Sequence, residues 1–308
     1  MGYHVPIMVR EVTEGLIFDP DGKYVDATAG GGGHSLALLR ALGPLGRLVA
    51  VDRDWEAVET ARLCLARDVR AMVLQGSFAE LGDVLAQKRV DAVSGFLFDL
   101  GVSSHQIDEP GRGFSYREDG PLDMRMDPAV GQSAADLLAA CSELELADLI
   151  KRYGEERQAR GIARAICRRR QLDALRTTHS LREVIAATRP QMLNKTLSRV
   201  FQALRIAVND EMGQLQAGLT AAVAGLKAGG RLAVIAYHSL EDRLVKQYMA
   251  ELERGCICPP RMPICNCGQR PTFKKVGRKP RRASEQEVNT NSRARSAILR
   301  IYEKLEMD

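Results

Sequence analysis

The sequence DATAGGGGHS, residues 26–35, places four consecutive glycines directly after a short apolar segment. A dinucleotide-binding turn needs the pattern G-x-G-x-x-G, but Ser35 or Leu36 stands where its third glycine would be. The acidic residue ahead of the glycines, Asp26, would repel a phosphate and attract an ammonium group. S-adenosylmethionine carries an ammonium and a sulfonium group and no phosphate. The pattern Asp-x-Thr-x-Gly-x-Gly therefore favours S-adenosylmethionine over NAD as the cofactor.

Three further residues that suit this cofactor follow later apolar segments. Asp52 comes twenty residues after Gly32, where a carboxylate can accept hydrogen bonds from both ribose hydroxyls. Phe78 is placed to lie against the adenine ring, and Asp99 beside the expected position of the transferred methyl group. An Asp after a strand is also a common helix cap or turn residue, so each position alone leaves both interpretations open. Together the positions favour S-adenosylmethionine. If the apolar segments are the strands of a parallel sheet, these residues lie at the carboxyl ends of the strands, where such sheets bind their ligands.

Short apolar segments that alternate with helical patterns must position these residues. Unbroken apolar runs predict strands of a parallel sheet that helices cover on both faces. The sequence therefore predicts an α/β fold with a doubly wound, Rossmann-like class I methyltransferase sheet. Its strands are expected at 23–27, 46–52, 70–75, 91–100, 231–237 and 296–305.

A long break in this alternation divides the chain into three segments. Residues 109–210 hold a loop rich in Gly and Pro and then helical patterns that no strand follows. We therefore expect the first part of the methyltransferase domain at 1–108 and its second part at 211–308. The segment between them is expected to form an all-helical inserted domain that recognises the substrate.

Positive charge is concentrated in two places, although the formal net charge of the whole chain is only +5. Residues 254–300 hold twelve Lys or Arg and two Asp or Glu, and residues 148–182 hold ten and four. Such blocks favour a polyanionic partner, nucleic acid above all, although a solvated helix face and a loose tail would give the same composition. No apolar run approaches the length of a membrane span, and the N-terminus has no signal-peptide pattern. We therefore expect a cytoplasmic protein that has no membrane partner.

Four of the seven cysteines form the pattern C-x-C-x6-C-x-C within the basic segment 254–282. They are Cys256, Cys258, Cys265 and Cys267. Structural zinc sites use such quartets, but their usual spacing is C-x2–4-C. We therefore favour a thiol-rich loop without a metal, and a zinc site is the alternative.

Three long and unusual segments carry a resemblance to a known family. They are DLGVSSHQID (99–108), RGFSYREDGPLDMRMD (112–127) and YHSLEDRLVK (237–246). With these segments the chain resembles the MraW family of ribosomal RNA small subunit methyltransferases almost from end to end. The resemblance implies methyl transfer from S-adenosylmethionine to the exocyclic N4 of a specific cytidine in the decoding region of 16S ribosomal RNA, with the small ribosomal subunit as partner. It also implies cofactor contacts by Gly32, Gly33, His34, Asp52, Phe78, Asp99 and Gln106.

Cytosine N4 is a poor nucleophile because its lone pair is delocalised into the ring. An oxygen that accepts a hydrogen bond from the amine would hold it pyramidal, and Asp99 is the expected acceptor. Many amino-methyltransferases have an Asp/Asn-Pro-Pro-aromatic motif at this strand end, whereas this chain has Asp-Leu-Gly-Val at 99–102. The candidates for the missing aromatic residue are Phe114, Tyr116 and Tyr237. His238 either receives the released proton or caps the helix that follows it.

The loop 110–127 and the helical insertion are expected to bind the substrate. In the loop, Arg112, Phe114 and Arg125 are the predicted contacts, although its charges of both signs also suit an internally paired loop. In the insertion, Arg168 belongs to a cluster of arginines that suits RNA phosphates. Two other functions stay open at this point, namely an NAD-dependent oxidoreductase and a non-catalytic RNA-binding assembly factor. The sequence also leaves open the oligomeric state.

Overall fold

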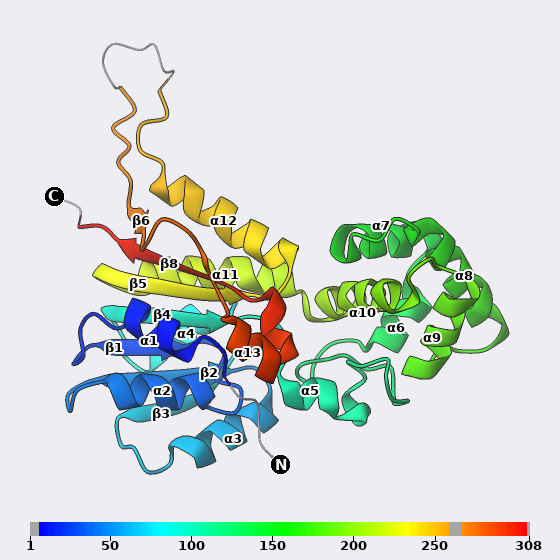
Figure 1. The fold of residues 1–308 in the computed structure, drawn as a ribbon, viewed down its shortest axis with the longest axis horizontal. Coiled ribbons are helices and arrows are strands. Elements are labelled where there is room, and N and C mark those ends of the chain that lie inside the picture. The colour runs from blue at the N-terminus through cyan, green and yellow to red at the C-terminus, as the bar shows by residue number, and fades with distance from the viewer. Residues whose placement is uncertain (1–5, 259–265, 307–308) are drawn as a thin grey trace. The chain divides into compact units, whose positions relative to one another are not determined.

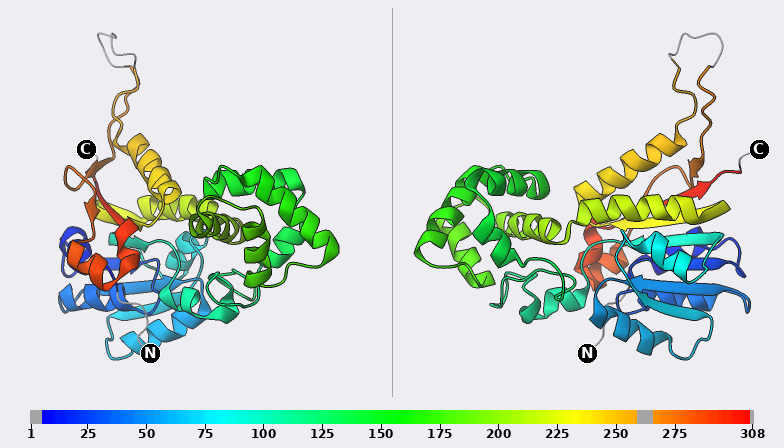
Figure 2. Two further views of the ribbon diagram at one scale, coloured as in Figure 1. Left: turned by 45° about the vertical axis from the view of Figure 1, so that its right-hand side comes forward. Right: turned by 180° about the vertical axis from the view of Figure 1, so that it is seen from behind.

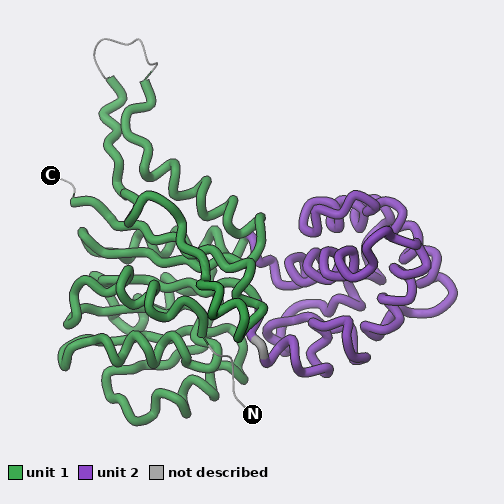
Figure 3. The backbone as a smooth tube through the Cα atoms, viewed as in Figure 1, with its two compact units in different colours: residues 1–101, 213–308 green, residues 102–212 purple. Residues whose placement is uncertain are grey.

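The chain forms two compact units, which the computed structural model describes for residues 6–258 and 266–306. One unit holds residues 1–101 and 213–308, and the other holds residues 102–212 (Figure 3). The sequence places these limits at 108 and 210. The second unit is thus an insertion between two parts of the first.

The first unit is built around one mixed sheet with the strand order β3-β2-β1-β4-β5-β8-β6 (Figure 1). Neighbouring pairs from β3 to β5 are parallel, whereas β8 runs antiparallel to β5, and β6 and β7 pair with β8. The strands are β1 Lys23–Asp26, β2 Arg47–Asp52, β3 Ala71–Gln75, β4 Val93–Asp99, β5 Leu226–Ala236, β6 Phe273–Lys275, β7 Arg281–Arg282 and β8 Ile298–Lys304. This order confirms the predicted doubly wound fold. Because β1 pairs with both β2 and β4, the strand order reverses at β1, where such sheets bind their ligands.

Both faces of the central strands are buried, because successive residues of these strands enter different cores. In β2, Leu48 and Ala50 belong to one core, while Val49 and Val51 belong to the other. The first core is closed by α1 Val9–Leu16, α2 Gly33–Ala41 and α3 Trp55–Leu65. The second core is closed by α4 Leu81–Gln87, α11 Glu211–Gly225 and α12 Ser239–Glu253. The short helix α13 Glu285–Thr290 lies on the chain between β7 and β8.

The second unit has a helical core of its own. Its helices are α5 Ser104–Asp108, the 3₁₀ turn η1 Pro110–Arg112, α6 Ala134–Ala140, α7 Glu143–Gly154, α8 Ala159–Leu172, α9 Thr178–Ala187 and α10 Leu193–Asn209. Side chains such as Ile150, Ile162 and Leu204 pack together in its interior. Capping boxes open α6, α7 and α9, and such caps contribute about 1 kcal/mol each.

Between α12 and β6 the chain leaves the sheet and returns to it. We call residues 254–258 and 266–272, the two described limbs of this segment, the arm. They run side by side in both views of Figure 2. The amide of Thr272 donates to the carbonyl of Leu252 at 2.9 Å and joins the two limbs at their base. In the described part of the chain, no helix has the length and apolar character needed to cross a membrane.

Candidate functional site

The glycine-rich turn connects β1 to α2 and is fixed by backbone hydrogen bonds. The amide of Ala29 donates to the carbonyl of Val51 on the neighbouring strand at 2.9 Å. Gly30 and Gly32 have φ angles of +50° and +84°, which favour glycine because a side chain strains that conformation. A Cβ on Gly32 would also lie 3.1 Å from the Cβ of Cys64 on α3. The turn therefore needs glycine both for its backbone conformation and for its contact with α3.

Asp52 closes β2 beside this turn. Its Oδ2 accepts a hydrogen bond from the amide of Gly30 at 2.8 Å, and its Oδ1 accepts one from the amide of Asp54 at 2.9 Å. Desolvation raises the pKa of its carboxyl to about 6, although the two amides act in the opposite direction. The side chain is partly exposed, and each oxygen has a further lone pair. It can therefore accept additional hydrogen bonds, such as those of two neighbouring hydroxyls.

Asp26 closes β1 and is fully buried. The hydroxyl of Ser35 donates to its Oδ2 at 2.7 Å, and the amide of Thr28 donates to its Oδ1 at 3.1 Å. Burial raises the pKa of this carboxyl. The sequence suggests that Asp26 faces an ammonium group, but the folded chain leaves it no exposed surface. The structure instead gives Asp26 a supporting role, because it ties the turn to α2.

Asp99 closes β4, and residues from three other parts of the chain contact it. The hydroxyl of Tyr237, directly after β5, donates to its Oδ1 at 2.7 Å. Its Oδ2 lies 3.2 Å from Nδ1 of His34, in the first turn of α2. The backbone amide of Asp99 donates to Oγ1 of Thr28 at 2.7 Å. The Asp99 side chain is 10% exposed, so these contacts fix a largely buried carboxylate.

The contacts of Asp99 determine the protonation of its two side-chain partners. Burial alone would lower the pKa of His34, but the hydrogen bond and charge of Asp99 and the charge of Asp26 raise it to about 9. Burial, and then Asp99, raises the pKa of Tyr237 well above its ordinary value of 10. At neutral pH the imidazolium of His34 therefore faces the carboxylate of Asp99, while Tyr237 stays protonated. The sequence analysis named His34 only as a cofactor contact and gave no sign of this ion pair.

His238 is the N-terminal cap of α12. Its Nδ1 accepts a hydrogen bond from the amide of Glu241 at 3.3 Å, and its Nε2 lies 3.1 Å from Oε1 of the same residue. With Nδ1 used as an acceptor, the proton of the neutral imidazole is on Nε2. No lone pair is then left to take a proton from a substrate. The structure thus supports the cap, which was the alternative interpretation, and not the catalytic base.

Phe78 follows β3 and packs into the second core. Its ring meets that of Phe98 edge to face, with 5.1 Å between the centroids. A Cβ on Gly218 of α11 would lie only 2.9 Å from the Cβ of Phe78, so glycine makes room for it. The predicted contact of Phe78 with adenine stays a prediction.

Gln106 belongs to the second unit, on the short helix α5. Its side-chain oxygen accepts a hydrogen bond from the amide of Ser103, and its own amide donates to Oγ of Ser103, both at 3.1 Å. The side chain is buried. Gln106 therefore stabilises the start of α5, and its contact with the cofactor stays a prediction.

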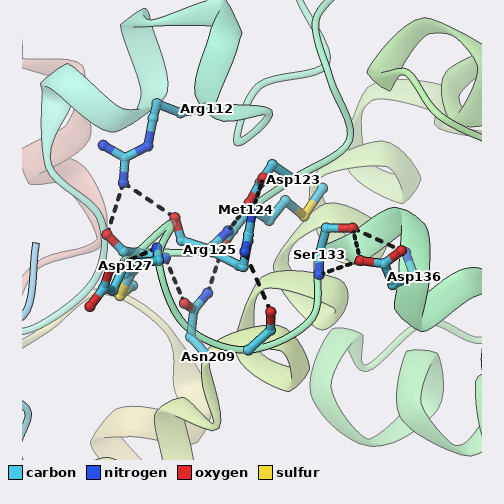
Figure 4. Close-up of polar contacts among 11 residues, drawn as sticks. Arg112, Asp123, Met124, Arg125, Asp127, Ser133, Asp136 and Asn209 are labelled. Carbon is cyan, nitrogen blue, oxygen red and sulfur yellow. Dashed lines mark hydrogen bonds and ion pairs between the residues drawn. The ribbon is translucent and has the colours of Figure 1, made fainter.

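The loop of the second unit is internally paired, and two of the predicted substrate residues have their partners inside it (Figure 4). Arg112 is buried, and its Nη2 donates to the carbonyls of Arg125 and Met126 at 3.2 and 2.9 Å. Arg125 binds the carboxylate of Asp123 with Nε and Nη2, at 2.8 and 2.7 Å. Both arginines hold the loop together, because its backbone carbonyls and its acidic residue lie within their reach.

Asn209, at the end of α10, anchors the same loop and was not singled out from the sequence. Its Oδ1 accepts from the amide of Met126, and its Nδ2 donates to the carbonyl of Met124, both at 2.8 Å (Figure 4). The side chain is buried. No spacing rule could have found it, because 83 and 85 residues separate these partners.

The other predicted substrate residues differ in exposure. Phe114 and Tyr116 pack against the core of the second unit, and the Tyr116 ring meets that of Phe201 edge to face. Arg168 on α8 is exposed, and no acidic partner lies beside it within the described residues. Its neighbours are paired, Arg164 with Glu143 and Arg169 with Asp173. Arg168 is therefore the member of this group best placed to bind an external anion.

A family model described as the MraW methylase family matches residues 1–305 of the chain. The chain belongs to the MraW methylase family. It is 48% identical to the ribosomal RNA small subunit methyltransferase H of Trichlorobacter lovleyi, with 98% of each chain covered. It is 46% identical to the protein of the same name from Heliobacterium modesticaldum, with 98% of this chain and 99% of that one covered. Among solved structures, it is similar to an rRNA methylase from Streptococcus thermophilus at 13% identity and a TM-score of 0.41, covering 97% and 94% of the two chains.

Membership of this methylase family confirms the resemblance seen in the sequence. It also confirms S-adenosylmethionine as the cofactor and removes the oxidoreductase alternative. The glycine turn, Asp52 and Asp99 lie where the strand order reverses, which is where a cofactor of this fold is expected.

Proposed function

We propose that this chain transfers a methyl group from S-adenosylmethionine to the exocyclic N4 of a specific cytidine in the decoding region of 16S ribosomal RNA. The observation that carries the proposal is the fixed carboxylate of Asp99 at the end of β4, held by His34 and Tyr237. The names of the relatives, ribosomal RNA small subunit methyltransferase H, support the class of substrate. A ribosomal RNA substrate supports a location in the cytoplasm and the small ribosomal subunit as partner.

The residues of the first unit fit the cofactor. The positive φ angles at positions 30 and 32 favour glycine. Because glycine has no side chain, the turn leaves room for the amino-acid part of the cofactor. The partly exposed carboxylate of Asp52 would accept hydrogen bonds from the ribose hydroxyls, and it is ionised above a pH of about 6. When bound, S-adenosylmethionine supplies an electrophilic methyl group.

Asp99 would act on the nucleophile. One of its oxygens accepts a hydrogen bond from the N4 amine and holds the nitrogen lone pair out of conjugation with the ring. His34 and Tyr237 keep this carboxylate ionised and oriented, because each directs a proton toward a different oxygen. The substrate therefore meets an acceptor whose position is set before it binds.

RNA would be held by exposed cations. Arg168 on α8 and the exposed Arg254 and Arg270 of the segment 254–282 suit the phosphates of a folded RNA. Arg112 and Arg125 bind partners inside their own loop, so the proposed RNA contact does not include them.

The test is methylation of small ribosomal subunits from a strain that lacks the enzyme, with labelled cofactor. We expect label on one cytidine N4, and a loss of about 100-fold or more in the rate for Asp99→Asn, because the amine loses its anionic acceptor. Asp83→Asn, which changes an exposed acid on α4, is the matched control and should act like the parent. Urea unfolding like that of the parent checks that the Asp99→Asn protein is folded.

Two results would overturn the proposal. Label that reaches no cytidine N4 with the parent protein would favour the non-catalytic assembly factor, especially if the cofactor still binds. An undiminished rate in both Asp99→Asn and Asp99→Ala would exclude Asp99 as the acceptor for the N4 amine.

A further inference from the structure

Three cysteines of the arm lie together, and the methyl-transfer site does not use them. Cys256 and Cys258 follow α12, and Cys267 is on the limb that returns to β6. Their three Sγ atoms all lie within 4.8 Å of one another, and those of Cys256 and Cys267 are 3.6 Å apart. Cys265, the fourth cysteine of the sequence pattern, lies outside the described residues. The two limbs thus bring together thiols that are up to eleven residues apart.

The separation of the sulfurs matches a shared metal ion. With Zn–S bonds of about 2.3 Å, the sulfurs of a tetrahedral site are about 3.8 Å apart. The Cys256–Cys267 distance of 3.6 Å is close to this value and far from the S–S bond of about 2.05 Å in a disulfide. The Sγ of Cys258 lies within 4.8 Å of the other two, close to the spread that three ligands of one ion require.

Backbone amides support negative charge on two of these sulfurs. The amide of Cys258 lies 3.4 Å from Sγ of Cys256, and the amide of Ile257 lies 3.4 Å from Sγ of Cys267. Hydrogen bonds to the charged form of a group favour that form. The same geometry favours thiolates, which are the form that binds zinc.

The arm has no other interior to hold it. None of its residues is buried, and Ile257 is 50% exposed. The hydrogen bond between Thr272 and Leu252 fixes only its base. A metal ion bound by both limbs would replace the missing core, because metal binding contributes directly to the folding of small segments.

We propose that Cys256, Cys258 and Cys267 bind one zinc ion as thiolates. The three thiols release their protons to solvent as three Zn–S bonds form, and no oxidation takes place. The ion cross-links the two limbs and so fixes the neighbouring cations Arg254 and Arg270 on a rigid arm. This site is structural, and it does not depend on the methyl-transfer proposal.

The first test measures zinc in the full-length protein, purified with a reductant and without a chelator, by mass spectrometry of the metal. We expect one zinc ion per chain in the parent and only a trace in Cys256→Ser and Cys267→Ser. Cys141→Ser is the matched control, since Cys141 is a partly exposed cysteine outside the arm, and it should keep the metal.

The second test replaces zinc by cobalt. Thiolate ligands give Co²⁺ strong charge-transfer absorption in the near ultraviolet, which adventitious binding to carboxylates does not give. We expect this absorption in the parent and in Cys141→Ser and its loss in Cys256→Ser. Trypsin should also cut the arm faster once a chelator has removed the zinc, because the limbs separate.

Three outcomes would overturn the proposal. One is a parent protein that holds no zinc after addition of one equivalent and gel filtration. Another is an equal zinc content in the parent and in Cys256→Ser. The third is a Cys256–Cys267 disulfide in the metal-free protein prepared under reductant. Methylation is measured separately, so the absence of zinc would leave the methyl-transfer proposal standing.

Discussion

Asp99 shares its two oxygens between donors of different kinds. Tyr237 directs a neutral hydroxyl at Oδ1, whereas His34 places a charged imidazolium beside Oδ2. The imidazolium compensates the buried charge of the carboxylate, and an uncompensated charge in this position would be costly. The ion pair therefore keeps Asp99 ionised and also connects the first turn of α2 to the end of β4.

The His34–Asp99 pair predicts a pH dependence of stability. The pKa of His34 is raised from 6.5 to about 9 in the folded protein, so the stabilisation is fully present below pH 6.5 and is lost as the pH rises through 9. The difference corresponds to about 3 kcal/mol. Urea unfolding of the cofactor-free protein at pH 6.5 and pH 9.5 measures it. We expect the parent to lose stability between these values and His34→Gln to lose much less; equal losses would contradict the ion pair.

At the scale of elements, the turn between β1 and α2 shows how far the sequence could be interpreted. The pattern Asp-x-Thr-x-Gly-x-Gly located the turn and its cofactor correctly. The contact of Asp26 with an ammonium group stays a prediction, and the pattern gives no sign that Ser35, in the first turn of α2, donates to Asp26. Six of the eight described strands were predictable from their apolar runs, which in the central strands reflect burial of both faces. The strands β6 and β7 were not predicted, because they have only three and two residues and no apolar run.

A glycine substitution tests this turn. In Gly32→Ala the new Cβ meets Cys64 at 3.1 Å and the residue keeps a φ of +84°. We expect a loss of about 1–2 kcal/mol in unfolding free energy and weaker cofactor binding. Gly161→Ala is the matched control, because Gly161 lies within α8 and a Cβ there meets nothing within 4 Å. It should be neutral or stabilising by up to about 1 kcal/mol. Unfolding and calorimetry distinguish the two variants, and equal effects would show that the turn tolerates a side chain.

At the scale of the whole molecule, the contacts that the sequence could not predict join distant segments. His34 comes before Asp99 in the sequence and Tyr237 comes long after it. Only the order of the strands in the sheet brings the three residues together. The sequence did not decide whether the charged residues of the loop 110–127 pair with one another or bind the substrate. Charges of both signs suit either internal pairs or an external ligand. Composition alone could not choose between them, whereas the distances from Arg112 and Arg125 to their partners do.

The proposed RNA contact of the second unit predicts a salt effect. Arg168→Glu removes one exposed cation and adds an anion, so RNA binding should weaken at low salt. The slope of log K against log salt should decrease by about 1 or slightly more. Arg67→Glu, a change of equal charge at an exposed position of the first unit, is the control. Filter binding of 16S RNA fragments over a range of salt measures both. An equal change in the two variants would indicate an effect of net charge alone.

The insertion of 102–212 between β4 and β5 has a consequence for synthesis of the chain. On the growing polypeptide β4 can pair with β1 at once, but its other edge has no neighbour until Leu226–Ala236 has been made. At about 5–20 residues per second, more than a hundred residues take on the order of ten seconds. During that time the helical unit can fold on its own core, while the free edge of the apolar strand β4 stays unpaired. The nascent chain therefore passes through an aggregation-prone stage that the finished protein no longer shows.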